Sequence, residues 1–245
     1  MDPPAVTIPQ RLTVVTDDGL RLAALLYRPS GAAAGAVLVC HGAGSRKENH
    51  GDFALRAVAR GFAALSFDFR GHGESEGADD GGGQGDVLAC AAALRAATGA
   101  PWLAARGSSM GAYLALSAAA REPRLFHRIA ALCPADEGAM LAGVDRLERM
   151  IADDDPDAFA FGAWDLPAVR AYYLRRDLAL VTDGLPGVLI VHARDDESVP
   201  FAASERLFAR LGEPKRLLGL DRGGHTGIQH DAALQEATLD WIAGE

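Results

Sequence analysis

The sequence is poor in cysteine and contains neither a cluster of basic residues nor a long apolar run. Its cysteines, Cys40, Cys90 and Cys133, are odd in number and lack metal-type spacing, so we expect no disulfide framework and no structural zinc. No stretch approaches the ~20 apolar residues that cross a bilayer. The amino terminus lacks the basic and apolar regions of a signal peptide. We therefore expect a cytoplasmic protein without a membrane partner.

The charge balance excludes a further class of partner. Acidic residues outnumber basic ones, 33 to 24, and the formal net charge is −9. Because phosphate binding needs clustered Lys and Arg, we expect no nucleic-acid partner. With 49% hydrophobic and 23% charged residues, the chain has the composition of an ordinary folded protein, and its 245 residues suit one large α/β domain.

One tight turn carries the strongest chemical signal. A short apolar run from Leu103 is joined to an alanine-rich helical run by only Gly107-Ser108-Ser109-Met110-Gly111. Such a strand, turn and helix hold the serine in strained backbone, and any Cβ at the flanking glycines would collide with neighbouring elements. The unpaired first amides of the helix can stabilise negative charge on a substrate oxygen. We predict that Ser109 is a nucleophile.

A second stretch with the same spacing serves as an internal comparison. Gly73-Glu74-Ser75-Glu76-Gly77 also fits the pattern, but the glycine-rich residues 78–83 that follow cannot begin an amphipathic helix. Ser108 would need glycines where Arg106 and Met110 stand. Only Ser109 has a strand before it and a helix after it.

Strand-like and helix-like segments alternate along most of the chain. The patterns predict a hairpin from 12–16 and 20–27, later strands at 36–40, 62–67, 129–133, 188–192 and 216–220, and helices at 53–60, 87–98, 202–211 and 231–242. This alternation predicts a mostly parallel sheet covered on both faces, with ligands at the carboxyl ends of its strands. From 136 to 186 only helix-like runs at 139–151 and 167–181 are found.

Polar residues follow two of the later predicted strands. Asp195 and Asp196 come after the strand that ends at His192, and His225 follows the last strand. The order Ser109, Asp, His225 is that of one particular fold. The chemistry agrees, because a serine hydroxyl needs a neutral imidazole to accept its proton and the imidazole needs a carboxylate to fix its tautomer.

With these motifs in this order, the chain resembles the α/β-hydrolases of the serine-esterase and lipase type. The resemblance rests on His41-Gly42, Asp68-Phe-Arg-Gly-His-Gly-Glu-Ser75, the turn at Ser109, Asp196-Glu-Ser-Val199-Pro200 and Gly224-His225. It implies an α/β-hydrolase core of residues 1–135 and 187–245 with a small helical cap inserted at 136–186. It also implies that Asp196, three residues before the Val of a Val-Pro pair, is the triad acid, and Asp195 is the alternative.

The resemblance extends to the rest of the site. It places the oxyanion hole at the amides of Met110 and Ala43. In the cap, Phe159, Trp164 and Tyr172 are candidates to line a pocket for an apolar acyl or alcohol group, although holding the cap to the body is the simpler role for each. The implied activity is cofactor-free hydrolysis of small to medium carboxylic esters. Thioester or amide cleavage and acyl transfer would use the same residues, and ligand binding without catalysis is the rival outside enzymes.

The loop after the first buried strand permits a second interpretation. Gly42-Ala43-Gly44 and the later Asp68 mimic a dinucleotide-binding fingerprint. Lys47 stands at the third glycine position, however, where a side chain crowds helix against strand, and this interpretation does not explain the turn at Ser109. No HxH or HExxH spacing is present, so we expect neither a cofactor nor a catalytic metal. The oligomeric state stays open.

Overall fold

The predicted mostly parallel sheet is present in the computed structural model, which describes residues 8–178, 182 and 184–245 except for the side chains of 159–161. The strands are β1 (Gln10–Val15), β2 (Arg21–Tyr27), β3 (Ala36–Cys40), β4 (Ala63–Phe67), β5 (Leu103–Ser108), β6 (Arg128–Leu132), β7 (Gly187–Ala193) and β8 (Lys215–Leu220). Their order is β1-β2-β4-β3-β5-β6-β7-β8. β2 pairs antiparallel with β1 and β4, and all other pairs are parallel.

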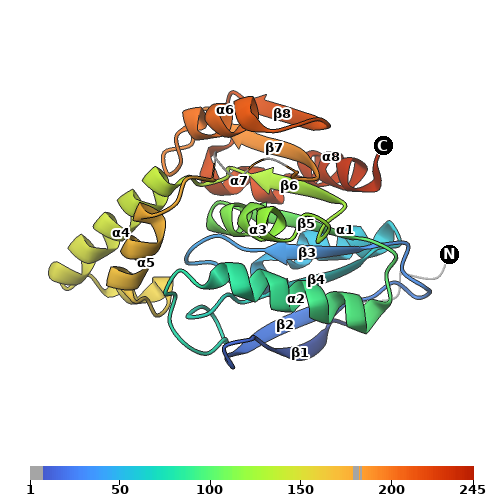
Figure 1. The fold of residues 1–245 in the computed structure, drawn as a ribbon, viewed down its shortest axis with the longest axis horizontal. Coiled ribbons are helices and arrows are strands. Elements are labelled where there is room, and N and C mark those ends of the chain that lie inside the picture. Colours follow the sequence, from blue (N-terminus) through green and yellow to red (C-terminus); the bar gives the residue numbers. More distant parts are fainter. Residues whose placement is uncertain (1–7, 179–181, 183) are drawn as a thin grey trace.

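Helices cover both faces of this sheet (Figure 1). The helices are α1 (Gly51–Ala59), α2 (Gly83–Thr98), α3 (Met110–Arg121), α4 (Glu137–Ala152), α5 (Leu166–Leu174), α6 (Phe201–Arg210), α7 (Gly224–His230) and α8 (Ala232–Ala243), with 3₁₀ turns η1 (Lys47–His50) and η2 (Pro156–Phe161). One apolar cluster joins the sheet to α2, α3 and α6, and another joins it to α1, α7 and α8. Within the described residues, none of these helices has the length and apolarity needed to cross a bilayer.

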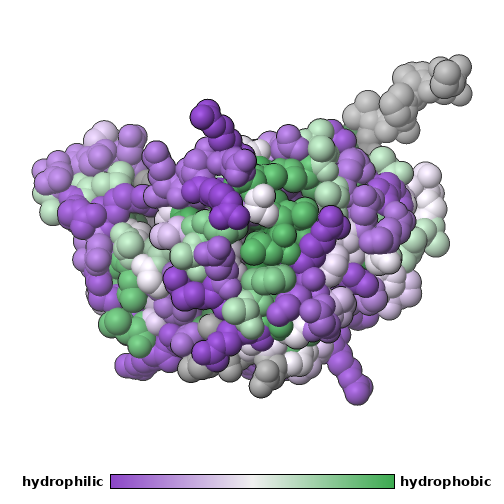
Figure 2. Space-filling view, turned by 90° about the horizontal axis from the view of Figure 1, so that it is seen from above, coloured by the Kyte–Doolittle hydropathy of each residue, from purple (hydrophilic) through white to green (hydrophobic). Residues whose placement is uncertain are grey.

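The burial of each strand follows from its place in the sheet. Every residue of β3, β4 and β7 is buried, as the continuous apolar runs of strands covered on both faces require. The edge strand β8, by contrast, consists of half-buried and exposed residues only. Figure 2, which views the molecule from above Figure 1, shows apolar residues on that face framed by hydrophilic ones.

The segment between β6 and β7 lies to one side of the sheet, where α4 and α5 lie side by side (Figure 1). Asp136 caps α4 by accepting from the Ala139 amide, and Asp165 caps α5 by accepting from the Ala168 amide. Buried residues of both helices, including Val144, belong to the same apolar cluster as buried residues of α2 and α3. This segment is therefore anchored to the body by apolar packing.

Two predicted helices differ from those observed. The run at 167–181 was expected to be one helix, but α5 ends at Leu174, and 179–181 lie outside the described residues. The helix predicted at 231–242 is α8, and α7 precedes it without having been predicted. Because α7 is one short element that begins at Gly224 and contains a second glycine, it carries no helical apolar pattern.

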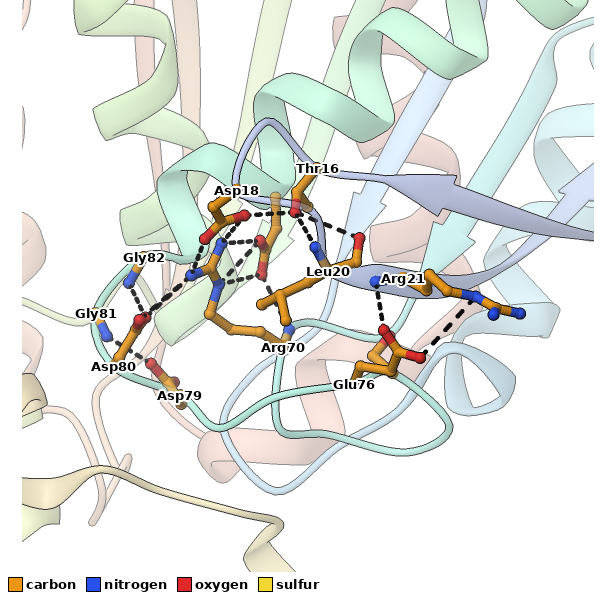
Figure 3. A network of polar contacts seen from close by, with 12 residues as sticks. Thr16, Asp18, Leu20, Arg21, Arg70, Glu76, Asp79, Asp80, Gly81 and Gly82 are labelled. Carbon is orange, nitrogen blue, oxygen red and sulfur yellow. Dashed lines mark hydrogen bonds and ion pairs between the residues drawn. The ribbon is translucent and has the colours of Figure 1, made fainter.

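A network of charges holds the glycine-rich loop that follows β4 (Figure 3). The buried Arg70 guanidinium lies 2.7 Å from Asp86 on α2, 2.9 Å from Asp18 in the β1–β2 turn and 3.2 Å from Asp80 within the loop. Burial raises the pKa of Asp86, and the bonds from Arg70 offset only part of that shift. The network therefore ties three segments together through one desolvated ion pair.

We expect Arg70→Leu to lower the free energy of unfolding by about 3–5 kcal/mol, because Asp86 would stay buried without its counter-charge. Asp80→Asn should cost at most about 1 kcal/mol, since Asp80 is half exposed. Urea unfolding followed by circular dichroism measures both changes. The double variant Arg70→Leu/Asp86→Leu should recover part of the loss. Equal losses from the two single variants would contradict this account.

Candidate active site

Ser109 lies in the turn between β5 and α3 with a φ of 51° and a ψ of −117°. Few residues other than glycine adopt such a positive φ. A Cβ added to Gly107 would lie 2.6 Å from the backbone of Ala112, and one added to Gly111 would lie 2.3 Å from the carbonyl oxygen of Cys40. The predicted close approach at both glycines is thus confirmed: β3, β5 and α3 meet at distances that only glycine permits.

Two free amides flank this turn. Both backbone groups of Ser109 are hydrogen-bonded: its amide donates to the Leu132 carbonyl, and its carbonyl accepts from amides of α3. The amides of Met110 and Ala43, by contrast, donate to no acceptor within the described part of the chain. Met110 is the first residue of α3, where helix geometry leaves amides unpaired. Ala43 lines the same cavity as Ser109. Both amides are therefore free to donate to an acceptor from outside the chain.

His225 meets Asp196. His225 is the second residue of α7, and its Nδ1 lies 2.7 Å from Asp196 Oδ2. The Asp196 side chain is fully buried, whereas 22% of the His225 side chain is exposed. Asp195 is exposed and instead accepts from the Gly224 amide at 2.8 Å. The structure therefore brings Asp196, and not Asp195, to the imidazole.

The His225 ring also lines the cavity that contains Ser109. Because Nδ1 faces a carboxylate, Nδ1 carries the proton and Nε2 is left as the basic nitrogen. No hydrogen bond joins Nε2 to the Ser109 hydroxyl among the described residues. Such contacts are often long before substrate binds and tighten in the reacting complex.

Four donors satisfy the Asp196 carboxylate. Oδ1 accepts from the amides of Ser198 and Val199 at 2.8 and 2.9 Å, and Oδ2 accepts from His225 and from Nε2 of His192. Burial alone would raise the pKa of Asp196, but the Val199 amide and the His225 contact outweigh it and lower that pKa. Asp196 is therefore ionised at neutral pH, as the partner of an imidazole must be.

Sequence reasoning did not single out His192, which is fully buried on β7. Its Nε2 lies 3.1 Å from both Asp196 Oδ2 and the Val199 carbonyl oxygen. Because both are acceptors, the ring proton must be on Nε2, and Nδ1 accepts from the Ser204 hydroxyl at 2.7 Å. Burial lowers the pKa of His192, so the ring is neutral. Its four-residue spacing before Asp196 was the only signal available.

A pair of histidines braces the loops around the site. His41 is fully buried after β3, donates from Nδ1 to the Gly42 carbonyl and accepts the Phe69 amide at Nε2. Burial lowers the pKa of His41 to about 3, so it is neutral. The His72 ring lies 5.2 Å from that of His41 and 5.4 Å from that of Trp164, measured between centroids. These rings connect the Ala43 loop to the segment between β6 and β7.

A cavity of about 490 Å³ opens onto Ser109 and His225. Besides these two residues it is lined by Ala43, Ala135, Ala139, Met140, Gly143, Val144, Arg146, Leu147, Met150, Trp164, Ser198 and Val199. Of the predicted pocket residues, Trp164 lies in this wall. Tyr172 lies elsewhere, against the Tyr173 ring and the Arg176 guanidinium. The side chain of Phe159 is outside the described residues.

The structure also bears on the dinucleotide interpretation. Asp68 is fully buried, and its carboxylate accepts from the Lys47 amide at 2.7 Å, the Lys47 ammonium at 2.6 Å and the Glu74 amide at 2.9 Å. An acidic residue that binds a ribose must present its carboxylate to the ligand. The Asp68 carboxylate instead accepts its hydrogen bonds from Lys47 and Glu74 of its own chain.

Among the described residues, Cys133, Asp196 and His225 are the group whose ligand atoms lie close enough together to hold a metal ion. Burial raises the pKa of the Cys133 thiol far above its ordinary value, so the sulfur is protonated at neutral pH. Cys133 Sγ lies 3.5 Å from the His225 carbonyl oxygen, and the Asp196 carboxylate is hydrogen-bonded to the His225 ring. Within the protein the three groups therefore form a hydrogen-bonded acid–imidazole pair beside a neutral thiol.

Comparisons with known proteins agree with this architecture. Residues 35–161, just over half the chain, match the family described as alpha/beta hydrolase fold. An uncharacterized protein of Mycobacterium tuberculosis is 28% identical over 228 residues, which cover 87% of this chain and 71% of that protein.

Three solved structures are similar along nearly the whole chain. DcsB in complex with its substrate analogue has a TM-score of 0.78 at 16% identity and covers 97% of this chain and 99% of its own. Est1E from Butyrivibrio proteoclasticus with bound ferulic acid has a TM-score of 0.75 at 23% identity, covering 95% and 98%. The Pyrococcus furiosus esterase Pf2001 has a TM-score of 0.70 at 17% identity, covering 97% and 88%. At these identities the likeness concerns the fold.

We expect the neutral His192 ring to carry its proton on Nε2 and to stay neutral as the pH falls through about 6.5, where an ordinary histidine titrates. Because burial lowers the folded-state pKa, the stability that His192 contributes is fully present above about 6.5 and is lost at lower pH, where the unfolded chain binds the extra proton. Long-range ¹⁵N–¹H NMR reports both the tautomer and the titration. A proton on Nδ1, or an ordinary titration, would contradict the assignment.

Proposed function

The chain belongs to the α/β hydrolase fold family, and on that premise we propose that it hydrolyses carboxylic esters through an acyl-enzyme on Ser109. One observation carries the proposal: a buried, ionised Asp196 orients His225 through Nδ1, and His225 shares its cavity with Ser109. That arrangement supplies a nucleophile, a base and a group that stabilises the charged base.

In the proposed reaction, His225 Nε2 takes the proton of the Ser109 hydroxyl as the oxygen attacks the ester carbonyl carbon. The amides of Ala43 and Met110 donate to the resulting oxyanion, and Asp196 stabilises the imidazolium. The tetrahedral species collapses, its alcohol leaves with the proton from His225, and Ser109 keeps the acyl group. His225 then deprotonates a water molecule that attacks this acyl group, which releases the acid and returns the proton to Ser109.

We further propose that residues 136–186 form a cap inserted into a core of residues 1–135 and 187–245. Support comes from α4, which supplies much of the cavity wall over Ser109. Backbone bonds also join this segment to the loop after β4: the Asp79 amide donates to the Ala163 carbonyl and the Asp165 amide to the Asp79 carbonyl, both at 2.8 Å. Such a cap closes the site from solvent on one side.

The structural neighbours support an ester as the scissile group. Pf2001 is an esterase, and Est1E binds ferulic acid, a small aromatic acid. A small-molecule ester with an apolar part fits a cavity walled largely by aliphatic side chains.

We expect Ser109→Ala to lower kcat on short p-nitrophenyl esters by about 10⁴–10⁶-fold, because it removes the attacking oxygen. Ser108→Ala is the matched control, since that hydroxyl is buried and has no hydrogen-bond partner among the described residues. A fluorophosphonate probe should label the folded wild type and Ser108→Ala but not Ser109→Ala. Undiminished turnover by Ser109→Ala would refute the mechanism, and failure to label the folded wild type would favour a ligand-binding protein.

We expect Asp196→Asn to lower kcat by about 10⁴-fold, because an amide donor facing Nδ1 favours the wrong His225 tautomer. Asp195→Asn should change kcat by less than about tenfold, since the Asp195 carboxylate caps the Gly224 amide on the surface. Steady-state kinetics on the same esters compares the neighbours directly. The reverse order of effects would show that the acid has been misassigned.

A further inference from the structure

One face of α4 forms the long wall of the cavity. Ala139, Met140, Gly143, Val144, Leu147 and Met150 all line it, and their spacing of three or four residues places them on a single stripe of the helix. These members are small, aliphatic or methionine, and Arg146, which also lines the cavity from α4, adds one exposed side chain that ends in a guanidinium. Along the six apolar residues the wall selects by shape rather than by hydrogen bonding.

The stripe has a near end and a far end relative to the nucleophile. The Ala135 amide donates to the Ser109 carbonyl oxygen at 3.3 Å, and α4 begins two residues later at Glu137. α4 then runs away from the sheet (Figure 1). Ala139 lies in its first turn and Met150 in its last, about 16 Å further along the axis at 1.5 Å per residue. The stripe thus begins in the part of α4 next to the Ser109 turn and leads away from the sheet.

Gly143 interrupts this wall about 6 Å beyond Ala139 along the helix axis. A Cβ built on Gly143 would have no heavy atom within 4 Å, although the residue lies in mid-helix and lines the cavity. Glycine is a poor helix former, and neither a positive φ nor a close neighbour requires it here. Its effect is to leave open the passage between the near part of the stripe and the part at Leu147 and Met150.

We propose that α4 measures an unbranched apolar chain next to the scissile carbonyl and that Gly143 sets how far this chain reaches. The inference rests on the proposed ester hydrolysis and names its substrate class: esters with a medium-length linear alkyl chain. Each methylene laid along the stripe leaves water, which is worth about fourfold in affinity. The methionines at both ends adapt to a flexible chain, since Met fills irregular gaps.

The test compares p-nitrophenyl butyrate with p-nitrophenyl decanoate. Wild type should have the higher kcat/KM on decanoate. Gly143→Leu fills the passage and should lower the decanoate-to-butyrate ratio of kcat/KM at least tenfold, because about two methylenes lose their contact at about fourfold each. Ala142→Leu is the matched control: it adds the same side chain one residue earlier, at an exposed position outside the cavity wall. It should keep the wild-type ratio.

Leucine is a better helix former than glycine, so thermal unfolding should show Gly143→Leu to be at least as stable as wild type. Decyl and butyl acetate, assayed with the same variants, determine whether the chain belongs to the acyl or the alcohol side. An unchanged ratio in Gly143→Leu in both series, or an equal fall in Ala142→Leu, would overturn the inference while leaving Ser109-dependent hydrolysis intact. Absence of any Ser109-dependent ester hydrolysis would instead overturn the proposed function.

Discussion

The buried hydrogen bond between Asp196 and His225 is the contact on which the rest of the site depends. A carboxylate removed from water is costly unless its lone pairs are satisfied. Here the strand β7, the loop after it and α7 supply the four donors. The His225 ring is thereby fixed in one tautomer. The short helix α7, the Asp196 loop and the buried His192 thus all donate hydrogen bonds to the same buried carboxylate.

The sheet and the order of the motifs could be predicted from the sequence because both depend on local patterns. The run at 36–40 matches β3 residue for residue, and the hairpin, the parallel strands and the turn at Ser109 lie where apolar runs and glycines indicate. Buried strands and close backbone approaches restrict which residue types fit, so their sequence patterns are strong.

What could not be predicted depends on contacts between distant segments. In the sequence, His192 is one more residue of an apolar strand, and its role depends on the tertiary contact between its ring and the Asp196 carboxylate. Tyr172 and Trp164 have similar aromatic character, yet their different places in the fold put only Trp164 in the cavity wall. α7 is too short for periodicity to reveal, and its glycines argue locally against a helix. In each case tertiary packing decides the outcome, and no local pattern encodes it.

The backbone pairing at Asp79 has a mechanical consequence. The amides of Asp79, Ala163 and Asp165 donate in turn to the carbonyls of Ala163, Gly71 and Asp79, which forms a short ladder between the loop after β4 and the region ahead of α5. Rotating one part against the other at this seam would break three peptide hydrogen bonds at once. Near Trp164 the two parts are thus joined through their backbones as well as through the contact between the Trp164 and His72 rings. Flexible side chains in the cavity wall, such as Met140, can change rotamer and so reshape the cavity without breaking this ladder.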